Sequence, residues 1–524
     1  MAQEREQWNS SWGFLMAAVG SAIGLGNIWK FPYVTGMNGG GAFVLVYLAA
    51  VMIVGMPVMI AELAMGRAVR RNPFGAFLEL TPPRSIAGLV AGPIAMLSGG
   101  VMLANGAWGM GSLVLATGIL AFRFGWAVAG VVNGIIAVTL ITGYYCVIGG
   151  WTLLYAVNSF VSIRPEKEFL NALVTGMNGG LELSIAGMAV FLGLTMLVVS
   201  RGIKKGIERC ANILMPVLFV LLLALILRGV SLPGAEKGVR FFLYPDFSKL
   251  TANSVMLALG QAFYSLSLGM GIIMTYGSYM KQDQSIVRGT FAVILFDTLA
   301  TVLAGLAIFP ALFALKGDPA AGPGLVFQIL PATFRQLPAG SLWCGIFFSV
   351  LAIAALTSSV SLLEVAVSFL TDHCRMRRTA AVCTAAVPLA VLGTLSAMSV
   401  AGWERLAGLH AVLKRCFGEV PDNFFDLLDT VACVWILPMS GMAIALFAGW
   451  AWGARYAMQE IRLSGDDWLD KPIWTLLSGF GDDPAYREYR GICTPATLWG
   501  VFIRFISPLA IMIAFLHSIG FIKL

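Results

Sequence analysis

The chain has 524 residues, of which 58% are hydrophobic and only 12% are charged, and its mean hydropathy is +0.84. These values exclude a soluble globular domain and predict an all-α polytopic membrane protein. The net charge of +7 requires no nucleic-acid partner, because basic cytoplasmic loops account for it. The eight cysteines and three histidines are scattered, so the sequence predicts neither a disulfide framework nor a zinc site.

Eleven apolar segments are long enough to cross a bilayer. They lie at about 11–37, 41–66, 126–160, 182–200, 210–230, 252–279, 286–315, 341–370, 379–400, 424–453 and 495–520. Lysine and arginine residues of the short loops favour a cytoplasmic N-terminus, and eleven crossings then place the C-terminus outside. Residues 1–8 are polar and lead directly into the first segment, so we expect no cleavable signal peptide.

The first segment is interrupted by residues that disfavour a regular helix. Gly20, Gly24 and Gly26 each cost about 1 kcal/mol relative to alanine in a helix, and Pro32 lacks a backbone donor. In lipid the freed backbone groups need a partner, such as another helix, water, an ion or a solute. Two half-helices that meet in mid-membrane offer such sites at their termini. Asn27 adds a side-chain oxygen there, although a kink used only for packing would leave the same pattern.

A further apolar stretch, 85–122, carries no charged residue. A single crossing there would invert the charge bias of every later loop. Asn105-Gly106 is a turn signal near its middle, so we predict two short helices that enter and leave from the cytoplasmic side. We expect this apolar hairpin to lie against the bundle without a role in transport.

The sixth segment contains a second interruption, at 261–271, where glycine, serine and glutamine break the apolar pattern. Spans one to five and spans six to ten would each begin with a broken helix. Interrupted spans in corresponding halves are typical of the binding site of a transporter.

Several motifs occur in order between Trp8 and Trp452. They are AVGSAIGLGNIWKFPY, MNGGGAF, AELAMGR, GYYCVIGGWT, GQAFYSLSLGMG, LTSSVSLLE and FFDLLD. Together they resemble the neurotransmitter:sodium symporter family, in its bacterial amino-acid transporter branch with a leucine-transporter-like fold.

The resemblance implies a single transporter domain over 1–524, built as a 5+5 inverted repeat with broken helices 1 and 6. The repeats would be 11–230, with the hairpin inserted, and 252–453, followed by an additional helix at 495–520. It also implies alternating access, sodium coupling and a place in the bacterial inner (cytoplasmic) membrane, as a monomer or a dimer.

Sodium is a hard cation that prefers oxygen ligands. The resemblance implies a first sodium site at Ala22, Asn27, Ser265 and Asp297, and a second at Gly20, Ile23, Ala354, Thr357 and Ser358. The residue types support the second site, because residues 357–359 form a cluster of hydroxyl groups inside an apolar span. Such hydroxyls also commonly bond back to the preceding helical turn, which is the alternative explanation.

Asp297 lies in the middle of an apolar span, where a lone carboxylate is costly. A purely structural role would need a buried lysine or arginine, and none is evident nearby in the sequence. Many family members have asparagine at this position, and some relatives need chloride near this sodium site. A fixed carboxylate supplies that negative charge, so we predict transport without chloride, unless Asp297 is protonated in the loaded state.

The substrate class follows from Gly24, which occupies the position where monoamine-carrying relatives have aspartate. The substrate must therefore bring its own carboxylate, as an α-amino acid does. The resemblance implies that this carboxylate contacts the first sodium, Leu25, Gly26 and Tyr145, although a tyrosine at membrane depth is often only a packed ring. The remaining predicted pocket is mainly apolar and suits a neutral, hydrophobic or aromatic side chain; it comprises Ser21, Ile141, Tyr264, Ser265, Ser267, Met270, Ser358 and Leu362.

The resemblance also implies two gates. Lys30 and Asp429 would form the outer pair, where the family usually has arginine first. The inner pair would be Arg5 and Asp372, with Trp8 and Tyr279 beside it, although charged residues at span ends are often only solvated.

Two other functions compete with sodium-coupled uptake. One is proton-coupled or exchanging amino-acid transport on the same fold, in which Glu364 or Asp297 titrates. The other is a non-transporting amino-acid sensor. No nucleophile–base or metal motif supports an enzyme.

Overall fold

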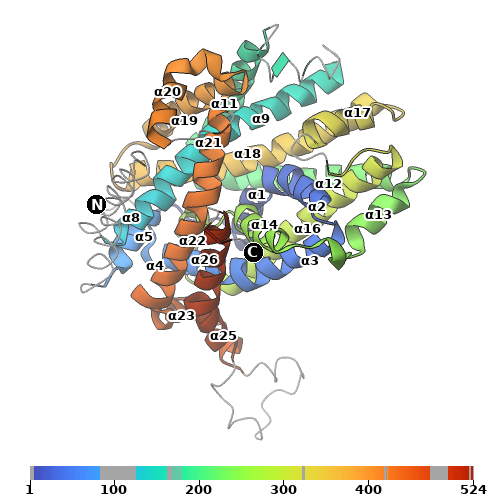
Figure 1. Cartoon of the computed structure of the whole chain (residues 1–524). Coiled ribbons are helices and arrows are strands. Elements are labelled where there is room, and N and C mark those ends of the chain that lie inside the picture. Colours follow the sequence, from blue (N-terminus) through green and yellow to red (C-terminus); the bar gives the residue numbers. More distant parts are fainter. Residues whose placement is uncertain are drawn as a thin grey trace, which may run out of the picture.

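The computed structural model describes residues 5–82, 125–161, 169, 172–173, 176, 179–320, 325–417, 421, 423–471, 494–518 and 521–522. All named elements within these ranges are helices (Figure 1), and the one pairing of extended backbone is an isolated bridge between Gly40 and Pro245. The hairpin predicted at 85–122 lies outside the described residues and stays a prediction.

Nine continuous helical segments of the described chain are long and apolar enough to cross a membrane. Several join α-helices to π-helical segments, which share the label η with the short 3₁₀-helices. They are α3 (Gly41–Ala50) with η2 (Val51–Gly55) and α4 (Met56–Val69); α8 (Ala127–Val131) with η3 (Val132–Ile136) and α9 (Ala137–Val161); α11 (Gly180–Ser200); η4 (Ile203–Glu208) with α12 (Arg209–Val230); α16 (Ile286–Ala314); α18 (Gly340–Asp372); α19 (Arg378–Val400); α21 (Phe424–Asp429) with η8 (Thr430–Ile436), α22 (Leu437–Leu446) and η9 (Phe447–Ala451); and α25 (Pro495–Val501) with η12 (Phe502–Ile506) and α26 (Ser507–Ser518).

The first span is broken where the sequence predicts it. Helix α1 (Ser11–Ala22) is followed by η1 (Gly26–Lys30) and α2 (Phe31–Met37), and the two halves are bent by 48°. The Ser10 side chain accepts a hydrogen bond from the backbone of Gly13 and so caps α1, and Ile23 ends the helix in an extended conformation with ψ 97°. The glycines beyond it let the chain bend without a buried side chain in the way.

The sixth span is also broken. Helix α14 (Ala252–Ser265) starts with a capping box at Thr251 and Ser254, and α15 (Ile272–Gly277) resumes after six non-helical residues. Within the gap, Ser267, Gly269 and Gly271 have φ values of +54°, +74° and +69°. The break is thus shorter than the predicted interruption, because α14 stays helical through Ser265.

Short helices connect these spans within the described ranges. They are α5 (Pro73–Leu80), α13 (Ala235–Leu243), η5 (Phe247–Lys249), η6 (Leu325–Ile329), α17 (Leu330–Phe334), η7 (Trp403–Leu406), α20 (Ala407–Phe417), α23 (Ala454–Arg462) and η10 (Asp467–Asp470).

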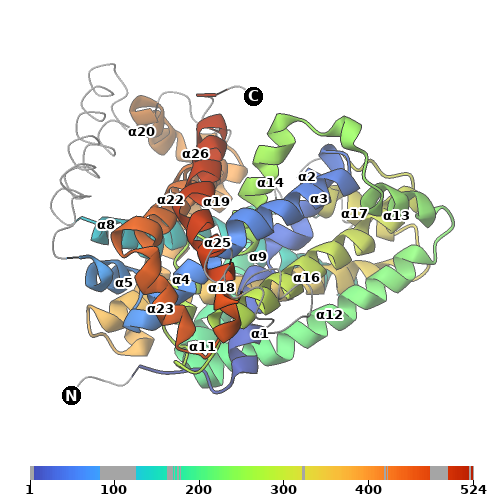
Figure 2. The ribbon, with the colours of Figure 1, turned by 90° about the horizontal axis from the view of Figure 1, so that it is seen from below.

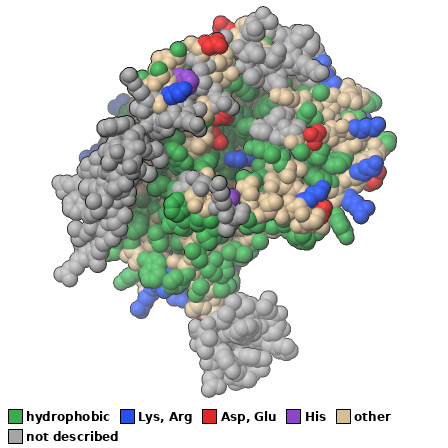
Figure 3. Space-filling view, viewed as in Figure 1, with side chains coloured by type: hydrophobic (Ala, Val, Ile, Leu, Met, Phe, Trp, Pro, Cys, Tyr) green, Lys and Arg blue, Asp and Glu red, His purple; other side chains and the backbone are tan. Residues whose placement is uncertain are grey.

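The broken spans lie at the centre of the bundle. Helix α1 contacts α12, α15, α16 and α18, while α9 packs along α18 between α11 and α19. From below, α12 follows the outer edge of the molecule (Figure 2), and only 28% of its span is buried. Hydrophobic side chains cover much of the described surface (Figure 3), as expected for helices that face lipid.

Candidate functional site

A small cavity of about 30 Å³ lies between the two breaks. It is lined by Ser21, Ala22, Gly24, Leu25, Gly26, Ile141, Tyr145, Tyr264, Ser267, Met270, Ile272, Ser358 and Leu362. These are the predicted substrate residues, except that Ile272 lines the cavity and Ser265 does not. The breaks, α9 and α18 therefore meet at one chamber, whose present volume is far below the roughly 300–1,000 Å³ of typical ligand pockets.

Side chains from neighbouring helices partner the backbone groups that the first break frees. The Leu25 N–H donates to the Tyr145 hydroxyl over 3.2 Å, and Gln261 donates to the Gly26 carbonyl over 2.8 Å. Ser267 and Ser358 each donate to the Ser21 carbonyl over 3.0 Å. The Tyr145 ring thus has a buried and positioned hydroxyl beside the break.

Gly24 is packed so closely that a side chain there would displace its neighbours. A Cβ atom built there would lie 2.6 Å from Ser358 Oγ and 3.0 Å from the Tyr145 hydroxyl oxygen. A carboxylate at this position would therefore require Ser358 and Tyr145 to move.

The predicted first sodium site is a compact polar cluster around Asp297. Asn27 Nδ2 lies 2.7 Å from Asp297 Oδ1 and 2.9 Å from Ser265 Oγ. The Ser265 hydroxyl lies 2.8 Å from Asp297 Oδ2, and Tyr47 donates to the same oxygen over 3.1 Å. Thr301 completes the cluster, with Oγ1 2.7 Å from Asn27 Nδ2. All five side chains are buried or nearly so.

This cluster has more oxygen acceptors than hydrogens. The Asn27 amide nitrogen has two hydrogens but lies within 2.9 Å of three oxygens, from Ser265, Asp297 and Thr301. Among the described ion pairs, none joins Asp297 to a lysine or arginine. A buried carboxylate that only dipoles compensate has an arrangement suited to a bound cation.

The predicted second sodium site brings α1 and α18 together. Ser358 Oγ lies 3.4 Å from the Ile23 carbonyl, and a Cβ atom on Gly20 would lie 3.3 Å from Thr357 Cβ. The Thr357 hydroxyl donates back to Ala354 over 3.1 Å, as expected for a helical threonine. The polar atoms that α1 and α18 bring together here are thus the hydroxyl oxygens of Thr357 and Ser358 and the carbonyl oxygens of Ile23 and Ala354. All of them are oxygens with lone pairs that could face a cation.

Tyr264 separates the cavity from a larger outer one of about 380 Å³, and is the one residue that lines both. Its ring lies against Gly26, where a Cβ atom would come within 2.6 Å. Lys30 and Asp429 both line the outer cavity but form no ion pair in the described chain. Lys30 Nζ lies 4.9 Å from the centre of the Tyr264 ring, and Asp429 accepts from Tyr144 over 2.8 Å.

The opposite end of the site is closed. Arg5 forms an ion pair with Asp372 and donates to Ser278 Oγ over 2.8 Å. Burial lowers the pKa of Arg5, but the charges of Tyr279 and Asp372 outweigh this, so its pKa lies above the usual value. Trp8 is fully buried and donates to the Tyr276 carbonyl over 3.0 Å.

A second ion pair lies beside the first. Glu364, fully buried in α18, pairs with Arg378 and accepts from the Tyr279 hydroxyl over 2.7 Å. This carboxylate therefore has a cationic partner, whereas no described ion pair gives Asp297 one.

Tyr47, Thr301 and Gln261 were not predicted from the sequence as residues of the site. Tyr47 is the one polar residue of its apolar stretch 43–50, and Thr301 follows Asp297 by one helical turn. Both features are visible in the sequence, but the sequence does not show toward which neighbouring helix each side chain points.

Comparisons with known proteins assign the chain to a family. The model of the sodium:neurotransmitter symporter family matches residues 5–99 and 164–410. The chain belongs to this family. An uncharacterized sodium-dependent transporter of Bacillus subtilis, YhdH, is 34% identical over 99% of both chains. An uncharacterized sodium-dependent transporter of Haemophilus influenzae is 29% identical, again over 99% of both chains.

A solved structure extends the likeness to the fold. The crystal structure of MhsT in complex with L-phenylalanine has a TM-score of 0.74 and 36% identity, covering 98% of this chain and all of that one. These comparisons confirm the predicted family, the helical membrane fold and the assignment to transporters rather than enzymes. At the level of the family, sodium use is shown as well.

Proposed function

We propose that this sodium:neurotransmitter symporter couples the uptake of a neutral, hydrophobic or aromatic α-amino acid to two sodium ions, without chloride. Uptake would follow alternating access, in which the outer cavity and the inner path open in turn. The described state, with the Arg5–Asp372 pair closed and the outer cavity present, corresponds to the outward side of such a cycle.

The observation that carries this proposal is the environment of Asp297. Its carboxylate is fully buried, and hydroxyl and amide dipoles surround it, with no cationic side chain paired to it among the described residues. A sodium ion at this position would be held by Asp297, Ser265, the Ala22 carbonyl and Asn27. The Asn27 amide would turn so that its oxygen, rather than the Nδ2 that now lies beside Asp297, faces the ion. The substrate carboxylate would complete the shell.

The second ion would sit between the break in α1 and α18. The carbonyls of Gly20, Ile23 and Ala354 and the hydroxyls of Thr357 and Ser358 supply five oxygens, which suits a hard monovalent cation. Because α1 and α18 belong to different predicted repeats, an ion there would hold the two repeats together.

The substrate would bind in the cavity beside the first sodium. Its carboxylate would reach the amides of Leu25 and Gly26 and the Tyr145 hydroxyl. Its side chain would lie among Ile141, Met270, Ile272 and Leu362, which present no charge. The solved relative MhsT was crystallised with L-phenylalanine, which supports a large apolar side chain here. Because the chamber is small, Met270 and Tyr264 would move to admit it.

Chloride independence follows from the same cluster. Tyr47, Ser265 and Asn27 direct their donors at a carboxylate. A chloride ion placed there would meet a like charge in a low-dielectric site, which is unfavourable. The fixed carboxylate instead balances the first sodium.

We also infer a bacterial inner-membrane location, with the N-terminus in the cytoplasm and the C-terminus outside, and a 5+5 inverted repeat over 11–230 and 252–453. The predicted asymmetry of loop charges supports the orientation, and the two broken spans support the repeat.

The test is binding of radiolabelled neutral amino acids to the purified protein, in sodium against potassium, with chloride replaced by gluconate. We expect binding of a hydrophobic amino acid in sodium only, undiminished by gluconate. Amino-acid binding that does not depend on sodium but changes with pH would assign the protein to proton-coupled transport. Sodium-dependent binding without accumulation in proteoliposomes that carry a sodium gradient would make it a sensor.

A further inference from the structure

A basic pocket lies far from the transport site, at the end of the bundle that carries the N-terminal segment. It has a volume of about 900 Å³ and is lined by Arg201, Lys205 and Arg209, all of them exposed. Lys204 adds a fourth exposed cation in the same turn. The transport mechanism uses none of these residues.

Local backbone geometry brings the three cations together. Gly202, with φ +84°, reverses the chain between α11 and η4. Gly206 then packs so tightly that a Cβ atom there would lie 2.1 Å from the Val198 carbonyl and 3.2 Å from Arg201 Cβ. Arg201 therefore lies against the turn from which Lys205 and Arg209 project, four residues apart and on one helical face.

Two acids lie nearby, and each accepts a hydrogen bond from a backbone amide rather than pairing with the cations of the pocket. Glu6 accepts from the Ile203 amide over 2.7 Å, and Glu208, which is 4% exposed, accepts from the Asn9 amide over 2.9 Å. Both carboxylates thus serve backbone groups of the N-terminal segment and η4. Within the described chain, no ion pair includes Arg201, Lys205 or Arg209.

The surface next to the pocket is apolar and faces lipid. Spans α11 and η4–α12 are 39% and 28% buried, among the lowest values of the nine spans. Their exposed residues follow helical spacing away from the pocket, with Val190, Leu194 and Leu197 on α11 and Ile213, Val217 and Val220 on α12. A cluster of cations thus adjoins two aliphatic stripes.

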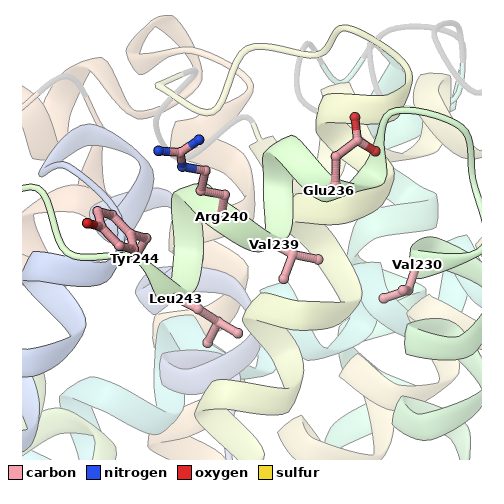
Figure 4. A pocket seen from close by; sticks show the side chains of 6 residues that line it. All are labelled: Val230, Glu236, Val239, Arg240, Leu243 and Tyr244. Carbon is pink, nitrogen blue, oxygen red and sulfur yellow. The ribbon is translucent and has the colours of Figure 1, made fainter.

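A second pocket, at the other end of α12, provides a contrast. Figure 4 shows Glu236 and Arg240 on α13 near Val230 and Tyr244. Its volume is about 480 Å³, and its lining carries one acid and one base. Of these two pockets, the one at Arg201 combines several cations with no acid among the described residues of its lining.

We propose that Arg201, Lys205 and Arg209 bind the phosphate headgroup of an anionic phospholipid, whose acyl chains lie along the exposed faces of α11 and α12. Guanidinium and ammonium groups recognise phosphate by charge-assisted hydrogen bonds, and basic pockets at helix ends are typical sites for acidic headgroups. Hydrogen bonds join Ile203 to Glu6 and Glu208 to Asn9, so they connect the turn below the pocket to the N-terminal segment. A bound lipid would therefore also stabilise this segment, which carries Arg5 and Trp8.

The test compares spin-labelled phosphatidylglycerol with spin-labelled phosphatidylcholine on the full-length protein in vesicles, by electron paramagnetic resonance. We expect a clear preference for phosphatidylglycerol in the unmodified protein. In the variant R201Q/K205Q/R209Q, binding of the anionic lipid should weaken about tenfold or more, to the level of phosphatidylcholine.

Two further variants fix the interpretation. R201K/K205R/R209K keeps the charges and should keep the preference, which excludes simple misfolding as the cause of the loss. K237Q/R240Q/K249Q removes as many cations near the second pocket and should leave the preference unchanged. Retention of the preference in R201Q/K205Q/R209Q, or an equal loss in K237Q/R240Q/K249Q, would overturn the proposal. Displacement of the lipid by inorganic phosphate at constant ionic strength would also overturn it, in favour of a soluble anion.

Discussion

The Tyr47 hydroxyl donates to Asp297 Oδ2 over 3.1 Å, deep inside the bundle and away from any charged side chain described there. This contact links the second span to the seventh. It places an aromatic donor on the carboxylate that we propose as a sodium ligand. A bond of this kind stabilises the ionised form of the acid, which is the form that binds a cation.

Replacement of Asp297 by asparagine should convert the protein from chloride-independent to chloride-dependent binding. The substitution keeps the shape of the side chain but removes its charge, so an external anion would have to supply it. In gluconate we expect sodium affinity to fall by about 1.4 kcal/mol or more, which is tenfold. Titration of amino-acid binding with sodium, in chloride and in gluconate, measures this.

The matched control is Tyr47→Phe, which removes one hydrogen bond, worth about 1 kcal/mol, and leaves the charge in place. This variant should bind sodium more weakly but stay indifferent to chloride. Chloride dependence in Tyr47→Phe, or its absence in Asp297→Asn, would contradict the proposed role of the carboxylate.

Substitution of Gly24 by alanine should abolish amino-acid binding, or weaken it at least about tenfold. The added methyl group would come within 2.6 Å of Ser358 Oγ and 3.0 Å of the Tyr145 hydroxyl oxygen. Gly193→Ala is the control, because a Cβ atom there meets nothing within 4 Å. Equilibrium binding to both purified variants decides the matter, and normal affinity in Gly24→Ala would show that the chamber adapts.

Removal of the Tyr264 ring should speed the release of bound substrate toward the outside. Tyr264 is the wall between the two cavities, so Tyr264→Ala would join them. We expect dissociation to become about tenfold faster, with a smaller change in the association rate. Tyr264→Phe keeps the ring and should behave as the unmodified protein. Washout of a preloaded radiolabelled amino acid measures these rates, and equal rates for both variants would refute the barrier.

Loss of Arg378 should destabilise the protein, because it would leave the buried Glu364 without its cationic partner. Breaking one side of a buried pair costs about 3–5 kcal/mol. Thermal unfolding in detergent should therefore show a large decrease for Arg378→Gln. The double variant Arg378→Gln with Glu364→Gln should recover much of it, and a double variant no more stable than the single one would argue against this pair as the cause.

The breaks were predictable because glycine and proline act locally. Gly24 lies in the gap between α1 and η1, whereas Gly20 stays within α1 and Gly26 begins η1. The motifs fix which residues meet at the break. This is why the lining of the cavity largely matches the predicted pocket, Ile141 and Leu362 included.

Contacts between helices were harder to predict from the sequence. Whether Tyr47 faces the core or the lipid depends on the rotation of α3, which an evenly apolar stretch does not encode. The partner of Glu364 comes from across the turn between α18 and α19. The sequence also does not give the distance between Lys30 and Asp429. In this structure both residues line the outer cavity without forming an ion pair.

The tight packing at Gly24 also bears on how such a carrier can acquire new cargo. A carboxylate at this position would let a bare amine bind, but Ser358 and Tyr145 already fill the space that it needs. In the proposed amino-acid carrier, one mutation at Gly24 would therefore disturb the existing site while it introduced the new group. A lineage that first opened room around the glycine would avoid this loss, so the packing favours one order of mutations.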